Sequence, residues 1–150
     1  MERLKEALSA AGIAYKENEP LCAHCTFRIG GPADLFVLPE NEEQLCAAIR
    51  LAKEAGVKSY LLGNGSNILF EDAGYRGAVI NVSAMKSGIG VIENISFPGK
   101  DPALTYDAVV VGAGQMLSSL CMAALENSLT GLEFAYGIPG TVGGAVYMNA

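Results

Sequence analysis

Apolar positions at the start of the chain follow helical spacing and then lose it. Leu4, Leu8 and Ala11 share one face of a helix predicted over residues 1–11. Residues 16–26 follow neither a helical nor a strand-like period, and we expect them to be irregular. The chain is therefore expected to begin with an amphipathic helix and a stretch without regular structure.

A strand predicted at residues 33–39 is followed by a second amphipathic helix. Asn41 can cap that helix, with Gln44 three residues later as in a capping box. The residues of its expected buried stripe are Leu45, Ala48, Ile49 and Ala52. Apolar runs at residues 57–62 and 77–82 predict two further strands. The order β-α-β-β is that of a small α/β layer with one crossover.

The second half of the chain has a different pattern. Residues 88–97 and 106–114 predict two strands, joined by a polar, proline-containing loop at 98–105. A helix is predicted over residues 115–127. The residues on its expected buried face are Leu117, Leu120, Cys121 and Ala124. From Thr130 the chain is rich in glycine and apolar residues, which suggests backbone packed against a flat ligand or another chain segment.

Length and charge narrow the class of protein. The chain has 150 residues, enough for one medium domain or two small ones, and 51% of them are hydrophobic. Its net charge of −6 argues against a nucleic-acid partner, which would need a basic face. No apolar run is long enough for a bilayer, and the charged N-terminus lacks the apolar centre of a signal peptide. We expect a soluble cytoplasmic protein with no membrane partner.

The four cysteines fall into two groups. Cys46 and Cys121 occupy apolar positions of predicted helices and are expected in the core. Cys22 and Cys25 flank His24 in a CxxC pattern, but no second CxxC or HxxxH offers the further ligands of a structural zinc. We expect a reduced pair and no metal site, with a metal or redox role as the alternative.

A polar run directly follows the predicted strand at 57–62. It consists of Gly63, Asn64, Gly65, Ser66 and Asn67. Glycines permit positive φ, so successive N–H groups can converge on one anion, and the serine and asparagine side chains add donors. The alternative is a polar surface turn. The run predicts a loop that holds a phosphate group, such as the diphosphate of a flavin dinucleotide.

Two other phosphate-binding patterns fit less well. The Gly-Lys pair at 99–100 is followed by aspartate, whereas a P-loop requires serine or threonine. Gly112 and Gly114 stand between a predicted strand and helix, with the acidic Glu133 about twenty residues on, as in a Rossmann fingerprint. The third small position of that fingerprint is Leu117. We expect these two glycines only to form a turn, and Leu117 to pack into the core.

Five segments, in order, resemble the family of UDP-N-acetylenolpyruvoylglucosamine reductases, also called UDP-N-acetylmuramate dehydrogenases. They are CTFRIGGPADLFVLPENEEQL, YLLGNGSNILF, YRGAVI, VVVGAG and GLEFAYGIPGTVGGAVYMNA. The last is the most specific, because it contains Gly-Ile-Pro-Gly-Thr-Val-Gly-Gly. The cysteine pair and the stretch FPGKDPALTY depart from the family's pattern.

The resemblance implies an α+β fold built of α/β layers, the two-subdomain FAD-binding fold of the vanillyl-alcohol-oxidase and p-cresol-methylhydroxylase type. The first subdomain is expected at residues 1–84 and the second, incomplete at its C-terminus, at 85–150. A substrate-binding subdomain is expected to be absent. The implied function is that of an FAD-dependent oxidoreductase in peptidoglycan synthesis, which reduces a UDP-sugar enolpyruvate with NADPH. The alternatives are a non-catalytic flavin-binding remnant and another flavin oxidoreductase of the same fold.

The resemblance also assigns the site. It implies that residues 63–67 hold the FAD diphosphate. The residues implied along the isoalloxazine ring are Ile138, Pro139, Gly140, Thr141, Val142, Gly143 and Gly144. Thr141 is the candidate for a hydrogen bond to the flavin near N5, with a simple turn residue as the alternative. The family's catalytic residues are expected beyond Ala150, so we name none and expect the 150 residues alone to be inactive.

Overall fold

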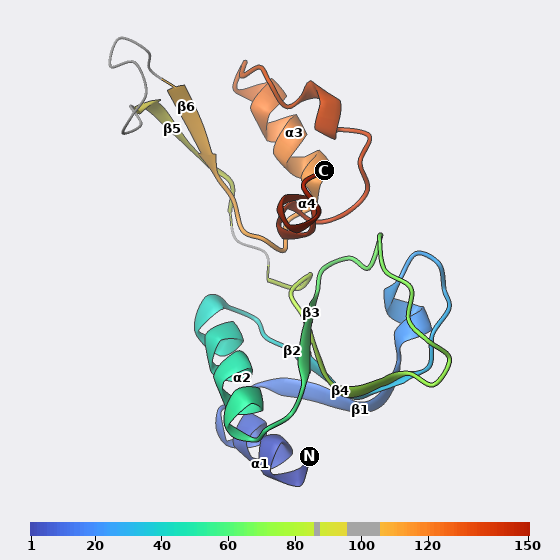
Figure 1. The fold of residues 1–150 in the computed structure, drawn as a ribbon. Coiled ribbons are helices and arrows are strands. Elements are labelled where there is room, and N and C mark those ends of the chain that lie inside the picture. Colours follow the sequence, from blue (N-terminus) through green and yellow to red (C-terminus); the bar gives the residue numbers. More distant parts are fainter. Residues whose placement is uncertain (86–87, 96–105) are drawn as a thin grey trace. The chain divides into compact units, whose positions relative to one another are not determined.

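The structure is a computed structural model that describes residues 1–85, 88–95 and 106–150. It divides into two compact units, Met1–Lys86 and Ser87–Ala150, each with a core of its own (Figure 1). None of the helices in the described ranges combines the length and the apolar composition that are needed to cross a bilayer. The loop predicted at residues 98–105 lies outside the described residues.

The first unit is built on a four-stranded mixed sheet. Its strands are β1 (Ala14–Pro20), β2 (Pro32–Leu38), β3 (Ser59–Leu62) and β4 (Tyr75–Asn81). The order across the sheet is β1-β2-β4-β3. β1 runs antiparallel to β2, whereas β2 and β3 are both parallel to β4. The last strand of this unit, β4, therefore lies between two strands that precede it.

Two helices cover one face of this sheet, α1 (Glu2–Ala10) and α2 (Glu42–Glu54) (Figure 1). Side chains of a strand alternate between its two faces, and those that meet the helices belong to one alternate set. The cluster they form contains Leu4, Leu8, Ile13, Leu35, Val37, Ala48, Ala52, Ala78 and Ile80. All of these residues are at most 3% exposed, so this layer is a closed hydrophobic core.

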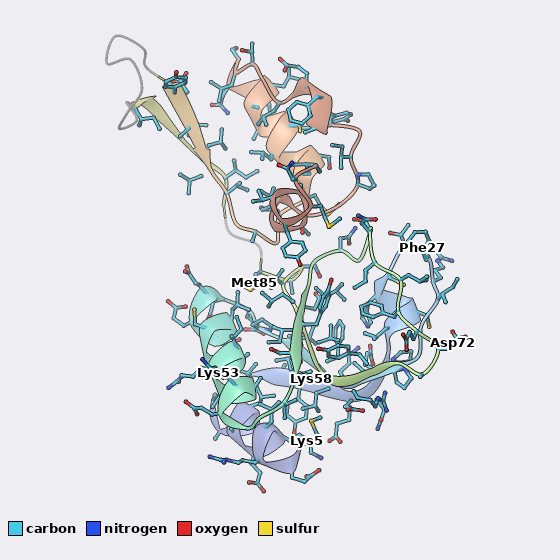
Figure 2. The ribbon with its side chains drawn as sticks, in the orientation of Figure 1. Lys5, Phe27, Lys53, Lys58, Asp72 and Met85 are labelled. Atoms are coloured by element: carbon cyan, nitrogen blue, oxygen red, sulfur yellow. The ribbon has the colours of Figure 1, made fainter. Side chains whose placement is uncertain are left out.

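The opposite face is covered without an α-helix. A short 3₁₀ helix, η1 (Leu21–His24), and the connection from β3 to β4 at residues 63–74 lie on this side (Figure 1). Figure 2 shows Phe27 and Asp72 on one side of the sheet and Lys53 of α2 on the other. The cluster on this face contains Leu21, Cys25, Ala33, Phe36, Leu62, Phe70 and Val79. A short 3₁₀ helix and a loop thus take the place of the α-helices that cover a sheet face in α/β proteins.

The second unit contains an antiparallel pair and a small helical cluster. The pair is β5 (Gly90–Ile95) and β6 (Tyr106–Val110), and the helical segments are α3 (Leu117–Glu126), η2 (Glu133–Ala135) and α4 (Val142–Met148). The predicted buried face of α3 is confirmed. All four of its residues, Leu117, Leu120, Cys121 and Ala124, are buried.

Residues 16–26, expected to be irregular, instead form most of β1 and then η1. The sequence of β1, AYKENEP, lacks an apolar period because the strand lies at an edge of the sheet and most of its side chains are exposed. Backbone pairing with β2 on both sides of Asn18 holds it in place. An edge strand of this kind depends on its neighbour more than on its own side chains.

The predicted helix faces were partly wrong. Cys46 is exposed, because it lies two positions before Ala48, on nearly the opposite side of a helix whose alanines face the sheet. Ile49 is 38% exposed at the flank of α2, although it was placed in the buried stripe. Ala11 is also exposed, because α1 ends one residue before it. The small Ala48 allows the helix to approach the sheet closely.

Candidate functional site

A cavity of about 380 Å³ opens in the first unit where β3 and β4 end. Because these strands are parallel, their carboxyl ends meet at one edge of the sheet, which is where open α/β sheets bind ligands. The lining comes from the end of η1 and the turn after it, from the start of the β3–β4 connection, and from the end of β4 and the residues just after it. The residues are Ala23, His24, Cys25, Thr26, Arg28, Gly63, Asn64, Asn81 and Ser83.

The two loops that flank the cavity are held together at Gly65. The Thr26 N–H donates to the Gly65 carbonyl over 3.0 Å. Gly65 has φ +64°, and a Cβ there would lie 2.0 Å from the His24 carbonyl oxygen and 2.8 Å from the Cys25 Cα. Only glycine satisfies both the left-handed backbone and the lack of space. The predicted phosphate loop is therefore braced against the turn after η1.

The side chain of Asn81 holds the start of the same loop in place. Its side-chain nitrogen donates to the Gly63 carbonyl over 3.0 Å. Its side-chain oxygen accepts the Ser83 N–H at 3.1 Å and also accepts the Ser83 hydroxyl. Asn81 is 5% exposed, and these bonds satisfy its buried amide. An asparagine directly after the apolar run at residues 77–80 was the sequence signal for it, and our sequence-based prediction missed it.

His24 is held in one orientation at the cavity. Its Nε2 lies 2.8 Å from Glu19 Oε1, and its ring stacks on Phe36 with centroids 4.0 Å apart. Lys16 Nζ lies 2.7 Å from the same carboxylate oxygen. Hydrogen bonds from Lys16 first and His24 second hold the pKa of Glu19 below its ordinary value. The ionised carboxylate can only accept, so Nε2 of His24 is the donor of this hydrogen bond.

Arg28 brings a permanent positive charge to the cavity wall. Its N–H donates to the Cys25 carbonyl over 3.2 Å, which closes a turn, and the Cys25 thiol donates to the Ile29 carbonyl over 3.3 Å. The backbone of Arg28 is left-handed, with φ +55°. The predicted site did not include Arg28 or His24. Both become part of a site only when residues about 40 positions further along the chain fold beside them.

Of the residues predicted in the polar run, Gly63 and Asn64 line the cavity. Gly65 is buried and serves the contact with His24, while Ser66 and Asn67 form the turn that follows. The structure therefore brings the front of the predicted loop to the cavity. It also assigns a packing role to the glycine in the middle.

The second predicted segment, residues 138–144, lies in the other unit and is described there by itself. It runs beside residues 113–117 in a short ladder of backbone hydrogen bonds. The Leu117 N–H donates to Gly140, the Val142 N–H to Gln115 and the Gly143 N–H to Ala113, over 3.0, 2.8 and 2.9 Å. These bonds tie the start of α4 to the start of α3.

Contacts within the unit explain why Gly143 and Thr141 occupy their positions in that segment. A Cβ on Gly143 would lie 2.8 Å from the Cβ of Ala113. Thr141 is 1% exposed and caps α4, because its hydroxyl oxygen accepts the Gly144 N–H at 3.2 Å. This cap is a structural role that was not among the two considered for Thr141. A contact of this segment with a flavin ring stays a prediction.

The Rossmann-like pattern forms a turn and a packed helix. The Gln115 N–H donates to the Gly112 carbonyl over 3.0 Å, which closes the turn that contains Gly114. β6, which precedes it, is antiparallel to β5 rather than part of a parallel βαβ unit. Leu117 is 5% exposed and packs in the core of the unit, as predicted.

A larger cavity of about 610 Å³ lies in the second unit, over the outer face of α3. Glu126 is the charged residue among those that line it. A phosphate group would be repelled there by the carboxylate, whereas the smaller cavity offers a guanidinium and several neutral donors. For anion binding the smaller cavity is therefore the better candidate, despite its size.

Comparison with known proteins identifies an FAD-binding family. Residues 33–150 match the family model described as FAD binding domain. A UDP-N-acetylenolpyruvoylglucosamine reductase of Clostridium perfringens is 40% identical over 155 residues, which cover 100% of this chain and 46% of the relative. The chain spans about half the length of the curated relatives it matches. The resemblance found in the sequence is thereby confirmed.

Solved structures agree on the fold. The UDP-N-acetylenolpyruvylglucosamine reductase of Thermus caldophilus is 30% identical, with a TM-score of 0.57 over 92% of this chain and 42% of that one. The VAO-type flavoprotein MtVAO713 from Myceliophthora thermophila is 16% identical, with a TM-score of 0.53 over 66% of this chain and 18% of that one. The second likeness shows the fold alone. Together they confirm the predicted α+β fold class.

Proposed function

Because the chain belongs to the family of FAD binding domains, we propose that it is the FAD-binding part of an NADPH-dependent oxidoreductase. The reaction proposed for the whole enzyme is the reduction of UDP-N-acetylglucosamine enolpyruvate to UDP-N-acetylmuramate in peptidoglycan synthesis. The support for this substrate is the name of the relatives that match the entire chain. A cytoplasmic location belongs to the same proposal.

The observation that carries the proposal is the cavity at the ends of β3 and β4. Its volume of about 380 Å³ is within the range of ligand pockets, roughly 300–1,000 Å³. Its wall offers the Asn64 amide and the Arg28 guanidinium as donors. At Gly65 the absence of a side chain lets the loop sit against the neighbouring turn. This donor set fits the diphosphate of FAD, and we assign residues 63–67 to hold it.

We further propose that residues 138–144 lie along the isoalloxazine ring. When bound, FAD would supply hydride transfer between NADPH and the enolpyruvyl group. Pro139 fixes the backbone of this segment, and the left-handed Gly140, with φ +138°, allows the turn that precedes α4. Thr141, whose oxygen accepts the Gly144 N–H, is the residue to which we assign a hydrogen bond with the ring near N5. The role of these residues would be to orient the ring and to keep water from it.

Binding of FAD to the purified chain tests the proposal. The chain is titrated into FAD and, separately, into riboflavin, while flavin fluorescence is followed. We expect saturable binding of FAD and much weaker binding of riboflavin, because riboflavin lacks the diphosphate. Equal affinity for the two ligands, or no binding of FAD, would contradict the assignment of the cavity.

NADPH oxidation is a second measurement. It is followed with FAD present, with and without the enolpyruvyl UDP-sugar. We expect no substrate-dependent oxidation by the 150 residues alone, because the residues assigned here serve the cofactor and general acid catalysis typically contributes about 10²–10⁴-fold. Turnover at the rate of a complete enzyme would show that a catalytic acid lies within this chain.

A further inference from the structure

The turn after η1 keeps an arginine in an unfavourable backbone conformation. Arg28 has φ +55°, a left-handed geometry that costs roughly 1–2 kcal/mol for a residue with a side chain. Two of the other non-glycine residues with positive φ are asparagines, Asn18 and Asn149, a type that tolerates this region. Strained residues of this kind gather where a ligand is held. A role other than folding stability would therefore explain why an arginine occupies this left-handed position.

The bonds around Arg28 show what maintains the strain. Its N–H bonds to Cys25, and the buried Cys25 thiol bonds to Ile29, so the turn is closed on both sides of the arginine. The neighbouring Thr26 is tied to Gly65 of the other loop. The surroundings thus fix the backbone of the arginine relative to the loop at 63–67. Arg28 is among the residues that line the cavity between them.

The electrostatics of the cavity favour an anion. Neither aspartate nor glutamate is found among its described lining residues, although the chain as a whole carries a net charge of −6. The Glu19 carboxylate is bonded to the lining residue His24, and it also pairs with Lys16. Arg28 is exposed and its positive charge is permanent, so it can bind an anion that enters between the loops.

We propose that Arg28 is a positioning residue that clamps the diphosphate of the bound dinucleotide against Gly63 and Asn64. A guanidinium presents its donors in a planar fork that matches two oxygens of a phosphate group. The clamp would make the cavity selective for ligands with a diphosphate over the bare flavin. This inference rests on the proposed function, because it takes FAD as the ligand of the cavity.

Substitution by asparagine separates the clamp from a structural role. Arg28→Asn removes the charge and places a residue that tolerates positive φ, so the variant should be at least as stable as the wild type. Its affinity for FAD should fall roughly 10- to 150-fold, the loss expected for a hydrogen bond to a charged group. Affinity for riboflavin should not change. The FAD affinity of Arg28→Lys should lie between those of the wild type and Arg28→Asn, because lysine keeps the positive charge but lacks the planar fork of donors.

The matched control is Arg50→Gln on the exposed surface of α2, which changes the net charge equally. It should bind FAD like the wild type. Inorganic pyrophosphate should displace FAD from the wild type and from the control more readily than from Arg28→Asn. Raising the ionic strength should weaken FAD binding less in Arg28→Asn than in the wild type.

Unchanged FAD affinity in Arg28→Asn would overturn the clamp while leaving the proposed function intact. An equal loss of FAD and riboflavin binding, or a loss of stability that accounts for both, would also overturn it, because either would mark a structural role. If the wild type binds no FAD, the proposed function fails and the clamp fails with it. Urea unfolding of each variant, measured beside the titrations, distinguishes these results.

Discussion

Gly65 provides a sharp test of how the two loops of the candidate site are joined. In Gly65→Ala a methyl group would be placed 2.0 Å from the His24 carbonyl oxygen and 3.0 Å from its carbon. Real Cβ atoms do not approach backbone this closely, so one of the two loops has to move by about 1 Å or more. We expect the variant to be destabilised and to lose FAD binding together with the cavity wall.

Gly56→Ala serves as the control because it has nearly the same backbone. Gly56 has φ +66°, compared with +64° at Gly65, and a Cβ there would meet nothing within 4 Å. Both variants share the cost of a left-handed alanine, about 1–2 kcal/mol, and the partial offset of about 0.4–1 kcal/mol from a less flexible unfolded chain. Only Gly65→Ala adds overpacking, typically about 1–3 kcal/mol. The difference between the variants isolates the contact between the loops.

Urea unfolding followed by circular dichroism measures this difference. At a slope of about 2 kcal/mol per M, an additional 2 kcal/mol lowers the midpoint of Gly65→Ala by about 1 M relative to Gly56→Ala. Amide exchange in β4 assigns the change to the first unit. Equal midpoints for the two variants would refute the close approach of Gly65 to His24, and with it the bracing of the predicted phosphate loop.

Three further predictions concern single groups. Thr141→Val should lower the stability of the second unit by about 1 kcal/mol through loss of the α4 cap, while Thr141→Ser keeps it; equal urea midpoints would exclude the cap. Folding lowers the pKa of Glu19 from its ordinary value of 4.5. The ionised carboxylate therefore contributes to folding stability above pH 4.5, and this contribution is lost as the pH falls through the folded pKa. Glu19→Gln should therefore lose less stability than the wild type between pH 6 and about 3, and parallel unfolding curves would argue against the ion pair. Under native alkylation followed by mass spectrometry, Cys46 should react before Cys25 and Cys121, because it alone of these three is exposed; simultaneous labelling would contradict its position.

Local signals were sufficient for the central elements of the first unit. The apolar runs located β2, β3 and β4, and Asn41 marked the start of α2. The predicted cap is present, since the Gln44 N–H donates to the Asn41 side chain over 2.9 Å. Its reciprocal bond differs slightly, because the Gln44 side chain accepts from the Glu40 N–H rather than from Asn41. Such features depend on residues within one turn of each other, which is why sequence indicates them.

The cavity depends on residues far apart in the chain, and the sequence indicated only part of it. Gly63 and Asn64 were found because glycine and asparagine in a row are a local signal. Arg28 and Asn81 were missed, because each gains its role only when distant parts of the chain come together. Arg28 lines the cavity with residues of another loop, and Asn81 bonds to the Gly63 carbonyl. The reason for Gly65 was only half anticipated: its positive φ follows from glycine, whereas its contact with His24 does not.

The position of β4 between β2 and β3 has a consequence during synthesis. On the ribosome β2 and β3 are made first, and the backbone groups that each will offer to β4 have no partner until Tyr75–Asn81 follows. At about 5–20 residues per second, the interval between the end of β3 and the start of β4 is about one to three seconds. Open strand edges during that time can pair with other chains. Mutations that weaken β4 should therefore lower the yield of folded protein in cells more than they lower the stability of the protein once it is folded.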